Sequence, residues 1–167
     1  MEVCLVRHAI AVDHGTPGYE NDDLRPLTPD GIKRFRQAAR GLASLVHPQV
    51  IMTSPLLRAR QTAEILMDTL GLAKLHFSDA LASGDHPTLL RDVVDLEARS
   101  VMLVGHEPHL SALLSYLVSG DAGTVSSLMK KGSAALLSTD GEGEVAPGRC
   151  SLQWLLQPAV LRALAGR

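Results

Sequence analysis

The chain of 167 residues has few aromatic residues and no surplus of positive charge. Aromatic side chains make up 3% of the residues, so Leu, Val, Ile, Met and Ala must fill the core. The 16 lysine and arginine residues face 18 aspartate and glutamate residues, a balance that argues against general nucleic-acid binding. No apolar run approaches the roughly 18 residues that a membrane helix requires. The N-terminus also lacks the pattern of a signal peptide.

Cysteine is scarce as well, with Cys4 and Cys150 the two in the chain, both inside apolar runs. We expect two buried thiols. Two cysteines alone cannot form a zinc site, and the histidines are not spaced around them as ligands. The sequence therefore predicts no metal, no other cofactor, and a reducing, cytoplasmic compartment. With 46% hydrophobic and 20% charged residues, residues 1–167 read as one globular domain.

Apolar runs and helical spacing alternate along the chain. Strands are predicted at 3–6, 50–53, 75–77, 101–104, 134–138 and 151–156. Helices are predicted from Pro29 with Thr28 as the N-cap, and from Ser54-Pro55, with Ser54 as the cap, to about Leu70, where Gly71 ends the helix. Residues 84–87 are predicted to form a loop, and further helices are predicted over 88–98, 108–118 and a last short segment around 161–164. This order predicts a three-layer α/β/α sandwich with a mostly parallel sheet. The last two strands, joined by a turn at 140–148, are expected to be antiparallel.

Two arginines and two histidines are predicted to meet at one edge of that sheet. Arg7 and His8 follow the first strand, and His106 follows the strand at 101–104. Arg58 lies in the first turns of the helix after the strand at 50–53. Parallel strands bring their carboxyl ends to one edge. Guanidinium forks suit a phosphoryl dianion, and a neutral imidazole can attack phosphorus, so this set favours phosphoryl transfer without a metal.

The motifs around these residues resemble the histidine phosphatase superfamily. They are Arg7-His8-Ala9, Arg25-Pro26-Leu27-Thr28-Pro29-Asp30-Gly31, Ser54-Pro55-Leu56-Leu57-Arg58-Ala59-Arg60-Gln61-Thr62-Ala63 and Val104-Gly105-His106-Glu107-Pro108. The chain is most similar to the short SixA-type phosphohistidine phosphatases. The resemblance implies a phosphoglycerate mutase-like fold. It also implies that His8 forms a phosphohistidine intermediate while Arg7, Arg58 and His106 bind the phosphoryl group.

The chain departs from the family pattern in two ways. Ala9 stands where the family usually has glycine, and alanine is strained if that backbone has a positive φ. The glutamate acid of the mutase branch is missing. Asp85 is the best-placed candidate acid, with a surface turn residue as the alternative. Arg25 either borders the phosphate pocket or pairs with Asp22 or Asp23.

These features predict a phosphatase that acts on phosphohistidine of a protein. Two alternatives stay open: a phosphomonoesterase for a small metabolite, and a decayed module that only binds phosphate or a phosphoprotein. The expected partner is a phosphorylated protein or a small phosphate ester, with neither nucleic acid nor membrane involved. We expect a monomer or a weak homodimer.

Overall fold

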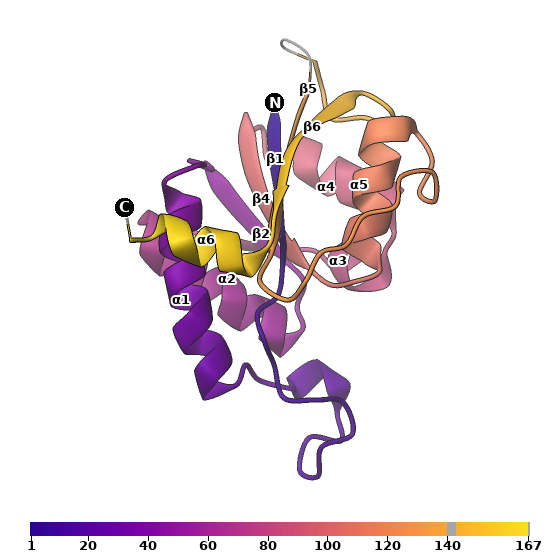
Figure 1. The fold of residues 1–167 in the computed structure, drawn as a ribbon. Helices are drawn as coiled ribbons and strands as arrows, with labels where there is room; N and C mark the ends of the chain where they lie inside the picture. The colour runs from indigo at the N-terminus through magenta and orange to yellow at the C-terminus, as the bar shows by residue number, and fades with distance from the viewer. Residues whose placement is uncertain (140–142, 167) are drawn as a thin grey trace.

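A computed structural model describes residues 1–139 and 143–166, which surround one six-stranded sheet (Figure 1). Its strands lie in the order β3 (Leu75–Phe77), β2 (Val50–Thr53), β4 (Ser100–Gly105), β1 (Glu2–Arg7), β5 (Ala134–Thr139) and β6 (Cys150–Leu156). The pairs β3–β2, β2–β4 and β4–β1 are parallel. β5 runs antiparallel to both β1 and β6, which confirms the predicted orientation of the last two strands. Residues 140–142 of the predicted turn lie outside the described residues.

Helices cover both faces of the sheet, as Figure 1 shows. One face carries α1 (Pro29–Ala43), α2 (Leu57–Leu70) and α6 (Pro158–Leu164). The other face carries α3 (Ala80–Ser83), α4 (His86–Val94) and α5 (His109–Ser119). The predicted three-layer α/β/α sandwich with a mostly parallel sheet is therefore confirmed. None of the helices in the described part of the chain is long and apolar enough to cross a membrane.

Successive residues of the central strand β1 enter two different cores. Val3 and Leu5 pack with α3, α4 and α5, whereas Cys4 and Val6 pack with α1, α2 and α6. A strand covered on both faces must be apolar at every position, which explains its unbroken hydrophobic run. Cys4 and Cys150 are both free and buried, as predicted.

The helix after β2 begins later than the sequence predicted. Ser54 was expected to cap it, but α2 begins at Leu57, and Leu56 at its N-cap makes no side-chain cap hydrogen bond. The Ser54 hydroxyl is instead engaged by His106. The end of α2 is as predicted: Gly71 has a φ of 69° and a left-handed conformation that glycine adopts without strain.

The segment before α4 also differs from the prediction. Residues 84–87 were expected to form a loop, but the short helix α3 precedes them and α4 begins at His86. Asp85 is the N-cap of α4, where its carboxylate accepts a hydrogen bond from the Thr88 backbone N–H at 3.2 Å. The helix also ends sooner than expected, at Val94.

Candidate active site

His8 and His106 directly follow the neighbouring parallel strands β1 and β4, whose ends are in register. Arg7 at the end of β1 is in register with Gly105 at the end of β4, and the His8 N–H donates to the Gly105 carbonyl at 3.0 Å. His106 follows directly on the other strand. The two imidazole rings lie with their centroids 5.1 Å apart. Strand register alone therefore brings His8 and His106 together at the carboxyl edge of the sheet.

The His8 ring is held in one tautomer. Its Nδ1 lies 2.7 Å from the Ala9 carbonyl oxygen, which can only accept, so Nδ1 carries the proton and Nε2 keeps its lone pair. The Ala9 N–H donates to the Thr62 hydroxyl at 3.0 Å, which ties this backbone to α2. Ala9 has no positive φ, so the alanine is accommodated without the strain that the sequence left open. This geometry leaves a lone pair on Nε2 that could act as a nucleophile.

His106 is positioned by Ser54, a residue from the neighbouring β2 end. The Nε2 atom of His106 lies 2.8 Å from the Ser54 hydroxyl oxygen. Its Nδ1 atom is buried and has no hydrogen-bond partner among the described residues. One nitrogen of the ring is thus fixed by the protein, and the other is available to a ligand.

Both arginines are fixed through their terminal nitrogens. Arg7 Nη1 donates to the Met129 carbonyl at 2.7 Å. Arg58 Nη1 donates to the Asp22 carbonyl at 2.8 Å, and Arg58 Nη2 donates to the Asp22 carboxylate at 3.1 Å. In the described part of the chain, the buried Nε atoms of Arg7 and Arg58 have no partner. Together with His106 Nδ1, these atoms are three buried nitrogens without a protein partner, as expected of a site for an anion.

Burial and neighbouring cations keep both histidines neutral. Burial is the largest cause, and together with the positive charges of Arg58 and Arg7 it outweighs the hydrogen bond to Ala9 and lowers the pKa of His8 to about 3. Burial and then Arg58 lower the pKa of His106 to about 3 as well. Burial lowers the pKa of both arginines, yet guanidinium stays protonated at neutral pH. A neutral imidazole, His8, therefore lies beside two fixed positive charges.

Arg25 belongs to this site through Asp22. Its Nε donates to one carboxylate oxygen of Asp22 at 2.7 Å, while Arg58 holds the other oxygen. The sequence left open whether Arg25 borders the pocket or pairs with an acidic neighbour, and the structure shows the pairing. The Asp22 bridge lies in the short 3₁₀ helix η1 (Asp22–Leu24), within the segment that projects below the body in Figure 1. Arg25 therefore contacts Arg58 only through the shared carboxylate of Asp22.

Asp85 is hydrogen-bonded to its own helix and to none of the four residues. Its carboxylate caps α4, is exposed, and has a pKa lowered by the Thr88 hydrogen bonds. A carboxyl group that stays ionised at neutral pH has no proton to donate. Asp22 is also kept ionised, because the hydrogen bond from Arg25 and the nearby arginine charges lower its pKa. Both aspartates are therefore ionised at neutral pH.

Several residues of this arrangement were missed by sequence reasoning. Ser54 was read as a helix cap, and Asp22 appeared only as a possible partner of Arg25. Thr62 and Met129 carried no signal, because a threonine within a helix and a methionine carbonyl resemble any other residue. Among the described residues, no group of three or more His, Cys, Asp or Glu side chains could hold a metal ion.

Comparison with known proteins places this geometry in a family. Residues 3–85 match the histidine phosphatase superfamily, branch 1. A protein of uncharacterised function from Picosynechococcus sp. strain PCC 7002 is 38% identical over 143 residues, which cover 83% of this chain and 86% of that protein. A solved structure from Agrobacterium tumefaciens, assigned as a phosphohistidine phosphatase SixA, is 27% identical with a TM-score of 0.75, over 94% of this chain and 98% of that chain. The fold also matches the protein histidine phosphatase SixA complexed with tungstate, with a TM-score of 0.77 and 24% identity, over 96% of this chain and 99% of that one.

Proposed function

This chain belongs to the histidine phosphatase superfamily and is a phosphatase, and from that premise we propose that its substrate is phosphohistidine on another protein. The observation that carries the proposal is the pairing of a neutral, oriented His8 with fixed guanidinium groups, beside two aspartates, Asp22 and Asp85, that both stay ionised. The similarity to structures assigned to SixA supports the same substrate class.

The first step transfers the phosphoryl group to His8. The lone pair of His8 Nε2 forms a bond to phosphorus while the bond from phosphorus to the substrate nitrogen breaks, and that nitrogen keeps the electron pair. Arg7 and Arg58 bind the equatorial oxygens, whose charge is largest in the transition state. His106 gains a proton beside the bound dianion, donates from Nε2 to Ser54, and donates from Nδ1 to the phosphoryl group.

The second step regenerates the enzyme. A water oxygen forms a bond to phosphorus as the bond to His8 Nε2 breaks, and the electron pair returns to Nε2. The water proton passes to solvent, and orthophosphate leaves. The Ala9 carbonyl keeps Nδ1 protonated throughout, so His8 returns to its starting tautomer.

The leaving group decides between phosphohistidine and an ordinary phosphate ester. An alkoxide needs a proton from a general acid, a contribution of about 10² to 10⁴ in rate. When a phosphohistidine is protonated on its second ring nitrogen, its imidazole leaves as the neutral form and needs no such donor. Asp22 and Asp85 both stay ionised, so this site suits the better leaving group.

The experiment has two parts. Intact-mass spectrometry after brief incubation with phosphoramidate, quenched at high pH, should show one added phosphoryl group that is acid-labile and absent in His8→Ala. Turnover of a phosphohistidine peptide should then exceed that of phosphoserine, measured as kcat/KM, by about 10²-fold or more.

Equal turnover of the two substrates would point to the phosphomonoesterase instead. An enzyme that forms no adduct and releases no phosphate, yet binds orthophosphate through Arg7 and Arg58, would be the decayed binding module. Measuring released phosphate excludes an intermediate that simply breaks down too fast to see.

A further inference from the structure

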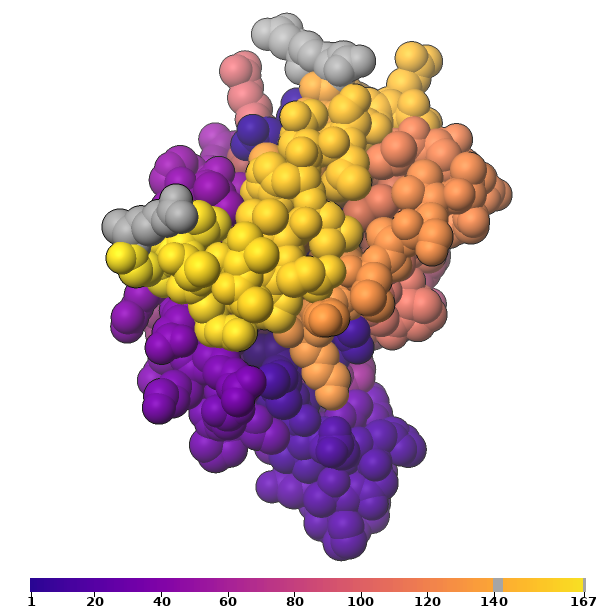
Figure 2. Space-filling model, viewed as in Figure 1, coloured from indigo at the N-terminus to yellow at the C-terminus, as the bar shows by residue number. Residues whose placement is uncertain are grey.

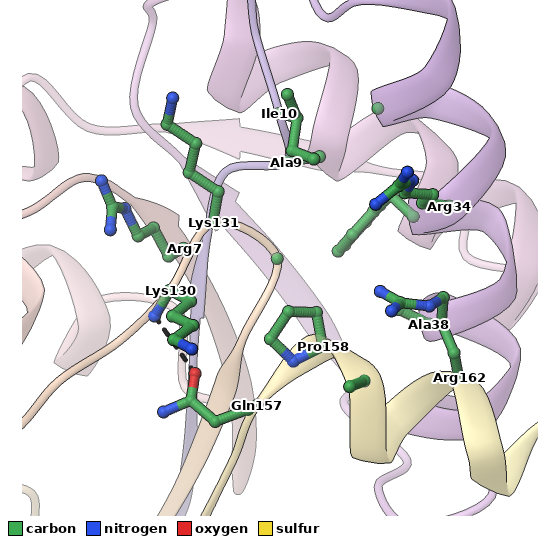
Figure 3. Close-up of a pocket in the computed structure, with 14 residues that line it drawn as sticks. Arg7, Ala9, Ile10, Arg34, Ala38, Lys130, Lys131, Gln157, Pro158 and Arg162 are labelled. Atoms are coloured by element: carbon green, nitrogen blue, oxygen red, sulfur yellow. Dashed lines mark hydrogen bonds between the residues drawn. The ribbon is translucent and has the colours of Figure 1, made fainter.

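A basic cavity adjoins the candidate active site on the side of α1 and α6. Its volume is about 400 Å³, and it lies between α1, residues 130–132 and α6 (Figure 3). In Figure 2 it opens where the purple, orange and yellow surfaces meet. Arg7 and Ala9, the two chain neighbours of His8, are among its lining residues, so the cavity borders the segment that carries His8. Phe35, Ala38 and Pro158 supply an apolar wall.

The charge of this cavity is opposite to that of the whole chain. Its charged lining residues are all basic: Arg7, Arg34, Lys130, Lys131 and Arg162. The full chain has a net charge of −2. Arg34 pairs with Asp30 at 2.7 Å, but Lys130, Lys131 and Arg162 make no ion pair with any carboxylate in the described part of the chain. Figure 3 shows Arg34 and Arg162 on one side and the two lysines on the other.

The segment that carries the lysines is fixed relative to the nucleophile. The Gly132 N–H lies 3.1 Å from the carbonyl oxygens of both Arg7 and His8, at a φ of 82° that favours glycine. From the other side, Gln157 donates from its amide nitrogen to the Leu128 carbonyl at 2.7 Å. Gln157 also accepts from the Lys130 N–H at 3.3 Å. An occupant of the cavity would therefore sit at a defined position relative to His8.

We infer that this cavity binds acidic side chains of the phosphoprotein, next to its phosphohistidine. The inference rests on the proposed function and extends it to the choice of substrate. Basic residues without carboxylate partners attract carboxylates, and the apolar wall of Phe35, Ala38 and Pro158 accommodates the side-chain stems of a peptide segment. The volume exceeds what a single small anion requires.

The test compares two synthetic phosphohistidine peptides of the same length, one with glutamates flanking the phosphohistidine and one with glutamines there. The wild-type enzyme should prefer the glutamate peptide by about tenfold in kcat/KM, chiefly through KM. In K131Q/R162Q the ratio should fall to about one to two. K74Q/R149Q removes one lysine and one arginine that do not line the cavity, and should keep the wild-type ratio.

Phosphoramidate separates this inference from the proposed function. It carries no acidic flank, so all three enzymes should turn it over equally. The inference is overturned if the wild-type enzyme shows no preference for the glutamate peptide, or if K131Q/R162Q keeps that preference. In either case, turnover of both peptides by the wild type leaves the proposed function intact. If the wild-type enzyme turns over neither the peptides nor phosphoramidate, the proposed function itself is overturned. If K131Q/R162Q itself loses phosphoramidate turnover, the exposed Lys130→Gln carries the same comparison.

Discussion

The arrangement of individual side chains around Arg58 shows how one acidic residue shapes the site. Asp22 offers both its carbonyl and its carboxylate to the two terminal nitrogens of Arg58, and Arg25 holds the same carboxylate. A phosphoryl group at the same guanidinium still finds the unpartnered Nε of Arg58. The carboxylate of Asp22 therefore opposes a dianion through its negative charge, while its carbonyl keeps Arg58 in place.

Asp22→Asn should bind orthophosphate about three to ten times more tightly than the wild type, as measured by isothermal titration calorimetry. The amide oxygen still accepts a hydrogen bond from Arg58, but the negative charge that repels the dianion is gone. Asp23→Asn is the matched control, since Asp23 is exposed and makes no hydrogen bond to Arg58. Weaker binding by Asp22→Asn would show that Asp22 chiefly positions Arg58.

At the scale of elements, the contact between α1 and α6 forms one side of the basic cavity. α1 presents Gly41 to the Leu161 carbonyl of α6, and a Cβ at Gly41 would lie 1.8 Å from that oxygen. The two helices approach this closely because no side chain separates them. The absence of a side chain at one position thus sets where Pro158 and Arg162 lie.

Gly41→Ala should destabilise the protein by roughly 1 to 3 kcal/mol in urea unfolding. Alanine favours a helix over glycine by about 1 kcal/mol, but the overlap with a backbone oxygen outweighs that gain because α6 must move. Gly123→Ala, whose Cβ would meet its nearest atom at 3.6 Å, should leave stability nearly unchanged. Equal stability of Gly41→Ala and the wild type would mean that α6 shifts without strain.

For the whole molecule, the two buried histidines link stability to pH. His8 and His106 have pKa values of about 3 in the folded chain, against about 6.5 in an unfolded chain. Above pH 6.5 the two histidines are unprotonated in both the folded and the unfolded chain, so they do not make the free energy of unfolding depend on pH. Between pH 6.5 and 3 the unfolded state binds more protons, so stability falls as the pH falls.

The free energy of unfolding should therefore decrease by up to about 1.4 kcal/mol per pH unit for each histidine between pH 6.5 and 4.5. This window lies above the ordinary titration range of the carboxylates Asp22 and Asp85, whose lowered pKa values act at more acidic pH. Urea unfolding at several pH values measures the slope. The double variant His8→Asn with His106→Asn should show a flatter slope, and an unchanged slope would locate the protons elsewhere.

Local patterns in the sequence were sufficient to predict the sheet, its layers and the edge at which the two arginines and two histidines meet. The apolar runs before His8 and His106 become adjacent parallel strands, so the two histidines had to lie at one edge. Thr28 caps α1 as its pattern predicted, with its side chain accepting from the Gly31 N–H. These features depend on residues that are near one another in the chain, or on the general geometry of parallel sheets.

The tertiary structure decided what the side chains touch. Ser54 fits a helix cap by its neighbours, but lies against His106 because β2 and β4 are adjacent in the sheet. Asp85 and Asp22 are both polar residues of connecting segments, yet Asp22 reaches Arg58 across 36 positions, whereas Asp85 caps its own helix. The sequence by itself determined which chemical groups reach the sheet edge. Only the folded chain decided their partners, because hydrogen bonds between distant segments leave no periodic trace in the sequence.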